Sequence, residues 1–135
     1  MLLSNFRRLG LREPSVHAGW FEDTLPGELP ESVAFAHIDV GPGLGGDHFQ
    51  RTVSDSLEAL YPRMPKGAIC LLADYCDPSV YERPGFHFPR SIPFTERWHM
   101  YPQVKRAADE FLADKPESVD VLYSECYSHG YFRKQ

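Results

Sequence analysis

Two continuous apolar segments that each end in an aspartate constrain the fold of this chain more than any other feature. The segment Ser32–Val40 reaches Asp39, and the segment Ala68–Tyr75 reaches Asp74. Apolar residues on both faces are typical of strands that helices cover on both sides. Between them, Asp47–Tyr61 carries apolar residues at helical spacing. A strand, a helix and a second strand in this order indicate parallel strands of an α/β sheet.

The rest of the chain fits the same class of fold. The apolar and turn patterns predict helices within 1–14, 24–29 and 103–113, and strands at 15–19, 119–124 and 127–133. The last two strands are expected to add an antiparallel edge. A chain of 135 residues makes one domain at most. We therefore expect residues 1–135 to form a single α/β domain with a mainly parallel sheet.

The segment 76–102 interrupts this pattern. It holds five prolines among many aromatic residues, so it is too broken for a core element and too aromatic for a plain linker. A long loop of this kind in a compact domain is typically a functional lid or a disordered segment. We expect a lid-like segment whose aromatic residues either cover a substrate ring or, equally, form an oligomer contact.

Charge and cysteine content narrow the class of protein. Fourteen basic and nineteen acidic residues give a net charge of −5, which argues against a nucleic-acid partner. The longest apolar run, 68–73, is far too short for a membrane span, and the N-terminus does not resemble a secretory signal. Three cysteines without a CxxC pair indicate free thiols, and hence a cytoplasmic protein.

The two strand-end aspartates are the candidates for chemistry. In α/β sheets, ligands bind beyond the carboxyl ends of the strands, where Asp39 and Asp74 would meet. Carboxylates at one rim can hold Mg²⁺, which lowers the pKa of a bound hydroxyl. A further carboxylate, Asp47, stands at the start of the following helix and can accept the proton. The alternative is that Asp47 caps this helix and the other two fix loops.

Six segments resemble one enzyme family when they are read in order. They are GWFEDTLP (19–26), AHID (36–39), DSLEALYPRMPKGA (55–68), ADY (73–75), AADEFL (107–112) and HGYFRK (129–134). Together they are similar to the macrocin and novobiocin type of O-methyltransferase, a branch of the class I S-adenosylmethionine-dependent enzymes. The resemblance implies a Rossmann-like sheet and magnesium-dependent methylation of a small-molecule hydroxyl, often on a natural-product sugar.

The resemblance also implies roles for individual residues. Asp39 and Asp74 match metal ligands of the family, whereas Ala73 stands where the family has a further aspartate. DHFQRT, which begins at Asp47, resembles the family's DLYEST, so an inserted glycine loop (41–46) would carry the general base to Asp47. A less favoured interpretation is that this loop binds part of the cofactor or a phosphate through backbone amides.

Gly19, Trp20 and Phe21 fall where the family approaches the adenine side of S-adenosylmethionine. Large aromatic residues more often anchor a core, and we favour that interpretation for Trp20 and Phe21. His37 shares a strand face with Asp39 and is more simply a core histidine than a ligand. His48 beside the candidate base can assist proton transfer, although a solvated helix start explains it equally well.

The resemblance covers only the C-terminal half to two-thirds of such an enzyme. The glycine-rich strand, turn and helix that cradle the cofactor do not precede Gly19. In the family sheet this first strand is central, so its loss would split the sheet and expose edges. We expect a homo-oligomer or a completing partner chain. Two hypotheses follow, an O-methyltransferase and a non-catalytic relict that serves in metal binding or dimerisation.

Overall fold

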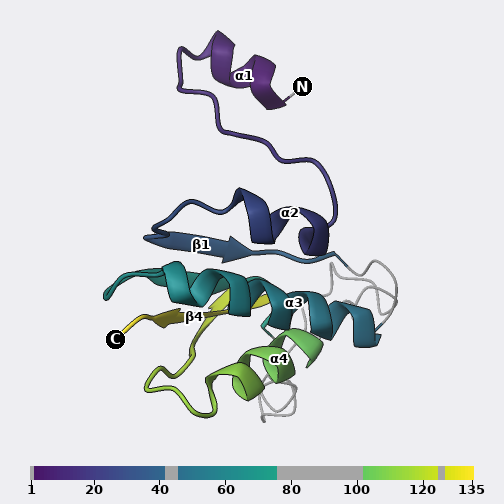
Figure 1. The fold of residues 1–135 in the computed structure, drawn as a ribbon, viewed down its shortest axis with the longest axis vertical. Helices are drawn as coiled ribbons and strands as arrows, with labels where there is room; N and C mark the ends of the chain where they lie inside the picture. The colour runs from purple at the N-terminus through teal and green to yellow at the C-terminus, as the bar shows by residue number, and fades with distance from the viewer. Residues whose placement is uncertain (1, 42–45, 76–101, 125–126) are drawn as a thin grey trace.

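The computed structural model of the chain describes residues 2–41, 46–75, 102–124 and 127–135. Its elements in chain order are α1 (Leu2–Arg8), α2 (Phe21–Glu28), β1 (Phe35–Ile38), α3 (Gly46–Leu60), the 3₁₀ turn η1 (Tyr61–Arg63), β2 (Ile69–Leu72), α4 (Pro102–Leu112), β3 (Asp120–Ser124) and β4 (Tyr127–Arg133). This α/β order confirms the expected fold class (Figure 1). Of the helices in the described ranges, none is both long and apolar enough to cross a membrane.

The four strands form one mixed sheet in the order β1-β2-β4-β3. β1 and β2 pair in parallel, and β4 pairs antiparallel with both β2 and β3. Three of the four strands therefore run in the same direction, as expected, and the C-terminal pair supplies the antiparallel part. The antiparallel strand β4 lies inside the sheet, so β3 is one edge and β1 is the other.

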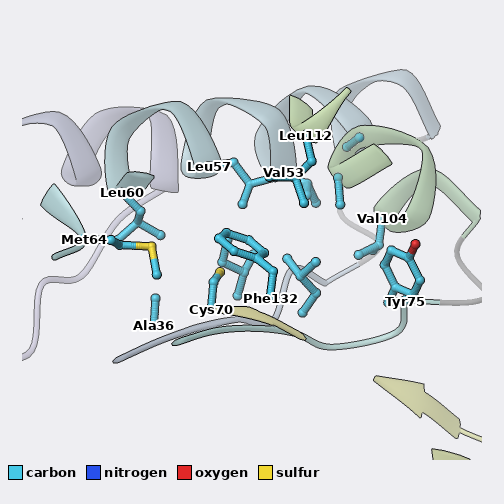
Figure 2. Close-up of a cluster of buried hydrophobic side chains, with 14 of the residues drawn as sticks. Ala36, Val53, Leu57, Leu60, Met64, Cys70, Tyr75, Val104, Leu112 and Phe132 are labelled. Carbon is cyan, nitrogen blue, oxygen red and sulfur yellow. The ribbon is translucent and has the colours of Figure 1, made fainter. Parts of the chain in front are cut away.

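The core fills the space between one face of the sheet and the helices α3 and α4. Ala36, Cys70 and Phe132 lie side by side in register on neighbouring strands, and all three are buried. Figure 2 shows them facing the apolar side chains of α3, including Leu57. The helix contributes a stripe of buried residues at helical spacing, Phe49, Val53, Leu57 and Leu60.

The opposite face of β1 departs from the prediction. Side chains alternate between the two faces of a strand, and along β1 they are alternately exposed and buried. Phe35 and His37 are exposed, so the expected cover on both faces is wrong for this strand among the described residues. His37 is accordingly not the core histidine that the sequence suggested.

The N-terminal region also differs from expectation. The helix predicted within 1–14 forms as α1, but the strand predicted at 15–19 does not form, and residues 11–20 have no regular structure. A strand needs a neighbour to pair its backbone groups, and in the described residues this segment has none. The sheet is not split. In the described ranges the sheet begins at β1, and no described strand pairs with the outer edge of β1.

The predicted lid at 76–102 lies outside the described residues except for Pro102, the first residue of α4. Most of the glycine loop, residues 42–45, also lies outside them. Cys70 is a buried free thiol, which agrees with its interpretation as a core residue.

A buried carboxylate fixes the C-terminal end of the sheet to η1. Glu117 accepts hydrogen bonds from the Tyr61 hydroxyl (2.8 Å) and from the backbone N–H of Gln135 (2.9 Å), and the Lys134 ammonium lies 4.0 Å away. Burial alone would raise the pKa of Glu117, but these hydrogen bonds and the nearby charge together lower it below its usual value. The folded state therefore favours the ionised form of Glu117.

Candidate functional site

The carboxyl ends of β1 and β2 meet at one rim of the sheet. Ile38 and Leu72 are register partners, and the N–H of Ala73 donates to the carbonyl of Ile38 (2.9 Å). Asp39 follows Ile38 directly, so it lies beside Ala73. Asp74 is one residue further along. Neighbouring strands are about 4.8 Å apart, so both aspartates stand on adjacent chain ends at this rim.

The two aspartates differ in their surroundings. Asp39 is exposed, whereas Asp74 is half-buried and has a left-handed backbone with φ of 56°. Aspartate is one of the few residues other than glycine that adopt this conformation readily. Ala73, which follows the last register pair of β1 and β2, is buried and offers only a methyl group. The rim therefore provides two carboxylates on adjacent strand ends and no third one at the position of Ala73.

This donor set fits one type of cation binding. In the described ranges, no group of three or more His, Cys, Asp or Glu side chains is arranged to hold a metal ion. A tightly caged metal would need such a group. Mg²⁺ commonly keeps several waters and takes only one or two carboxylates together with substrate oxygens. Two carboxylates are within the number that Mg²⁺ takes, whereas the described residues form no dedicated protein cage for a metal ion.

A cavity of about 280 Å³ lies next to Asp39. Its wall is formed by the start of α2, the end of β1 and the first turns of α3. The lining residues are Gly19, Trp20, Phe21, Glu22, Asp39, Val40, Gly41, His48 and Thr52. The cavity thus brings together the three residues predicted on the cofactor side and one predicted metal ligand. Asp47 and Asp74 are not among its lining residues.

Trp20 and Phe21 are not core anchors, contrary to the favoured interpretation. The side chain of Trp20 is 56% exposed and that of Phe21 is 36% exposed. The Trp20 ring meets the His48 ring edge-on, with centroids 6.4 Å apart. Neither residue is buried in the core, and both line the cavity next to Asp39.

Gly19 shapes the turn into α2. A Cβ atom on Gly19 would lie 2.8 Å from Cγ2 of Thr24, closer than such atoms approach in practice. Thr24 is held in place because its hydroxyl donates to the carbonyl of Trp20 (2.9 Å). Gly19 therefore allows the chain to pass close to α2 and present Trp20 at the cavity.

His48 is the residue whose position the sequence left open. It lies in the first turns of α3, half-buried on the cavity wall, with its Nε2 3.6 Å from a carboxylate oxygen of Glu22. A carboxylate behind an imidazole can orient the ring. Asp47, the predicted base, is exposed in the same first turn. Because α3 begins at Gly46, Asp47 lies inside the helix.

Behind Asp74, a buried tyrosine fixes the end of β2. The hydroxyl of Tyr75 donates to Asp109 on α4 (2.6 Å), and Lys105 also donates to Asp109. Burial, and then the hydrogen bond to Asp109, raise the pKa of Tyr75 to about 12, so this hydroxyl stays protonated. Gly130 on β4 leaves room for the Tyr75 ring, because a Cβ there would lie 2.6 Å from its Cγ.

This support for the end of β2 was not predicted from the sequence. The available signal was an isolated glycine inside a predicted strand, which often marks a close approach of another group. Gly130 stands in such a position in β4. What the sequence could not supply was the identity of the approaching group, because Tyr75 and Gly130 are 55 positions apart in the chain.

Comparisons with known proteins agree on one family. The sequence profile of the macrocin-O-methyltransferase (TylF) family matches residues 2–83. The 8-demethyl-8-(2,3-dimethoxy-α-L-rhamnosyl)-tetracenomycin-C 4'-O-methyltransferase of Streptomyces olivaceus is 35% identical over 99 residues, which cover 69% of this chain and 35% of that protein. The mycinamicin III 3''-O-methyltransferase of Micromonospora griseorubida is 36% identical over 80 residues, covering 58% of this chain and 29% of that protein.

A solved structure supports the fold. The structure of the O-methyltransferase NovP matches with a TM-score of 0.63 and 24% sequence identity, over 98% of this chain and 43% of that chain. At this level of identity the match concerns the fold alone. The chain spans about a third of the length of the curated relatives that it matches.

Proposed function

This chain belongs to the TylF macrocin-O-methyltransferase family, and on that premise we propose that it takes part in S-adenosylmethionine-dependent methylation of a hydroxyl on a small molecule. The two curated relatives are named as O-methyltransferases of a tetracenomycin glycoside and of a mycinamicin. A natural-product sugar is therefore the proposed class of acceptor. Gly19, Trp20 and Phe21 are the proposed cofactor-side residues.

One observation carries this proposal: a single cavity joins the proposed cofactor-side residues to Asp39. A methyltransferase must bring its donor and acceptor to one place, because most of its rate enhancement comes from their alignment. The exposed rings of Trp20 and Phe21 provide an apolar surface at one side of the cavity, and Asp39 provides a charged group at the other. Both kinds of surface are needed for a nucleoside cofactor next to a hydroxyl.

We further propose that Asp39 and Asp74 hold Mg²⁺ in a hydrated form. The proposal rests on their adjacent strand ends and on the acidic character of the rim. The cation would supply charge that favours ionisation of the acceptor hydroxyl. The buried tyrosine next to Asp74 supports this arrangement, because its hydrogen bond to Asp109 fixes the backbone at the end of β2.

The acceptor proton needs a base. When bound, S-adenosylmethionine would supply the methyl group from its sulfonium sulfur and leave as the neutral thioether S-adenosylhomocysteine, and the proton of the acceptor hydroxyl would pass to a side chain of this chain. We propose Asp47 as the group that receives the proton. His48 is the second candidate, because it lies on the cavity wall with Glu22 behind it.

Calorimetric titration of the chain with S-adenosylmethionine, with and without Mg²⁺, tests the proposed function. We expect heat of binding with a defined stoichiometry. Absence of heat under both conditions would instead favour the non-catalytic module. The observation that supports the non-catalytic module is Ala73, which provides no third carboxylate at the rim.

The metal proposal has its own test. Asp39→Asn should abolish any Mg²⁺-dependent rise in Tm, because it removes a charged ligand without changing the size of the side chain. Asp120→Asn on β3 is the matched control, since Asp120 is also exposed but stands on the far edge of the sheet. An unchanged rise in Asp39→Asn would remove Asp39 from the site.

The proton acceptor can be identified with labelled S-adenosylmethionine and a set of hydroxylated sugar acceptors. We expect Asp47→Asn to lose methyl transfer and to retain cofactor binding. If His48→Gln loses transfer and Asp47→Asn does not, the base is His48.

A further inference from the structure

We propose that Glu22 selects the base of the cofactor, because its carboxylate accepts a hydrogen bond from the 6-amino group of adenine. This inference rests on the proposed use of S-adenosylmethionine and deepens it, since it concerns a residue to which the family resemblance gives no role. Adenine is a flat ring with a polar edge. A pocket that recognises it needs a flat apolar surface and, beside it, a polar group that reads the edge.

The cavity next to Asp39 combines these two kinds of surface. Trp20, Phe21 and Glu22 are consecutive residues at the start of α2, and all three line the cavity. The two aromatic rings supply the apolar surface on which a base can stack. Glu22 follows them directly, so a carboxylate lies beside that surface. The wall consists of residues from α2, the end of β1 and α3, so the outer edge of β1 takes no part in it.

Glu22 is better placed to read the base than the other polar side chains of the cavity. These are Asp39, His48 and Thr52. The hydroxyl of Thr52 donates to the carbonyl of His48 (3.0 Å), so its hydrogen is already engaged. Asp39 lies at the rim of the sheet, where it is the proposed metal ligand. Glu22 is therefore the carboxylate that lies next to the aromatic pair and has no other proposed role.

His48 holds the Glu22 side chain beside the aromatic surface. The Nε2 atom of His48 lies 3.6 Å from Oε1 of Glu22, and the ring of Trp20 meets the ring of His48 edge-on with centroids 6.4 Å apart. Among the described residues, the second carboxylate oxygen of Glu22 has no hydrogen-bond partner. The contact with His48 thus restrains the carboxylate and leaves one of its oxygens for a ligand.

Hydrogen-bond direction makes a carboxylate selective for an amino group. An ionised carboxylate accepts hydrogen bonds and cannot donate them. The 6-amino group of adenine donates, whereas an oxygen at the same position of a purine only accepts. A base with oxygen at position 6 would place two acceptors opposite each other. A site that binds one polar group in this way rejects an analogue that cannot make the same hydrogen bond.

Binding of two product analogues tests the inference without any methyl transfer. S-inosylhomocysteine differs from S-adenosylhomocysteine in the purine, where an oxygen replaces the amino group at position 6. Isothermal titration calorimetry should show that the wild-type chain binds S-adenosylhomocysteine at least about tenfold more tightly. Glu22→Gln should reduce this preference to about threefold or less, because a side-chain amide can donate as well as accept.

Two further variants separate recognition of the base from a general effect on the cavity. Glu22→Ala should weaken binding of S-adenosylhomocysteine without improving that of S-inosylhomocysteine, whereas Glu22→Gln should improve the latter. Asp55→Asn is the matched control and should keep the wild-type preference. Asp55 is an exposed carboxylate on α3 that shares a neighbouring cavity with Glu22 but does not line the cavity next to Asp39. All three variants should retain wild-type circular dichroism, because both side chains are exposed.

The outcomes distinguish this inference from the proposed function. If the wild-type chain binds S-adenosylhomocysteine and Glu22→Gln keeps the full preference for it, Glu22 does not read the base. The inference is then wrong and the proposed cofactor stands. The same holds if the wild-type chain binds both analogues equally well. If it binds neither analogue, the inference and the proposed cofactor are both wrong.

Discussion

Replacing Gly130 by alanine should destabilise this protein strongly, although the same change in a strand normally helps. A Cβ at this position would lie 2.6 Å from Cγ of Tyr75 and 2.7 Å from Cγ1 of Val119. The tyrosine ring cannot easily move away, because it is 4% exposed and its hydroxyl is bound to Asp109. Either the strand shifts or the ring gives up its hydrogen bond.

The expected magnitude follows from three contributions. Overpacking a core costs about 1–3 kcal/mol. Loss of a hydrogen bond to a charged acceptor, here Tyr75 to Asp109, costs about 1.5–3 kcal/mol. Removing the backbone freedom of a glycine in a strand gains only about 0.5–1 kcal/mol. We therefore expect the free energy of unfolding of Gly130→Ala to fall by about 2–5 kcal/mol.

Urea denaturation followed by circular dichroism measures this change, provided that the m-value is unaltered. Gly27→Ala is the matched control, since a Cβ at Gly27 in α2 meets nothing within 4 Å and should leave stability equal or higher. In a Tyr75→Ala background the cost of Gly130→Ala should drop by at least about 1 kcal/mol, because one of the two clashing groups is gone. A Gly130→Ala protein within about 0.5 kcal/mol of wild type would refute the reasoning.

Three further outcomes follow from the described contacts. Leu57→Ala should cost about 2–5 kcal/mol in the same urea assay, because its side chain is buried between α3 and the sheet, and a cost under about 1 kcal/mol would contradict the packing. Glu117 has a lowered pKa in the folded state, so its stabilising contribution is complete above its unfolded pKa of about 4.5 and is lost as the pH falls through the folded value. Glu117→Gln should therefore reduce the acid-induced loss of stability, and an identical pH profile would argue against this role. Burial raises the pKa of the Cys70 thiol to about 12, so peptide mapping after iodoacetamide treatment at pH 8 should find Cys70 unmodified until urea unfolds the chain, and rapid labelling of the native protein would contradict its burial.

Most elements of the sheet were predictable because their signals are local. The stripe on α3, the apolar segments of β1 and β2 and the tyrosine-rich segment of β4 are patterns within one element each, and the structure places these elements where the patterns predict. Boundaries differ by a few residues, as in β1, which is shorter than the segment Ser32–Val40. The family resemblance was also accessible, since it depends on short motifs in order.

The errors have a common physical cause. The segment 15–19 has the composition of a strand, but a strand forms only where another strand pairs with it, and no described strand does. Trp20 and His37 have residue types that are often buried, but the elements around them leave both exposed. In each of these cases the outcome depended on a neighbour that lies elsewhere in the chain.

The sequence by itself therefore determined most of the segments that become helix or strand, that Asp39 and Asp74 follow two successive strands, and the family to which the chain belongs. Only the tertiary structure decided that Ala73 lies next to the end of β1 at Asp39, that Gly130 makes room for Tyr75, and that one cavity joins Asp39 to Trp20 and His48. Periodicity encodes which face of an element is apolar, because side-chain direction repeats along the backbone. It does not encode which elements meet, because that depends on packing between residues far apart in the chain.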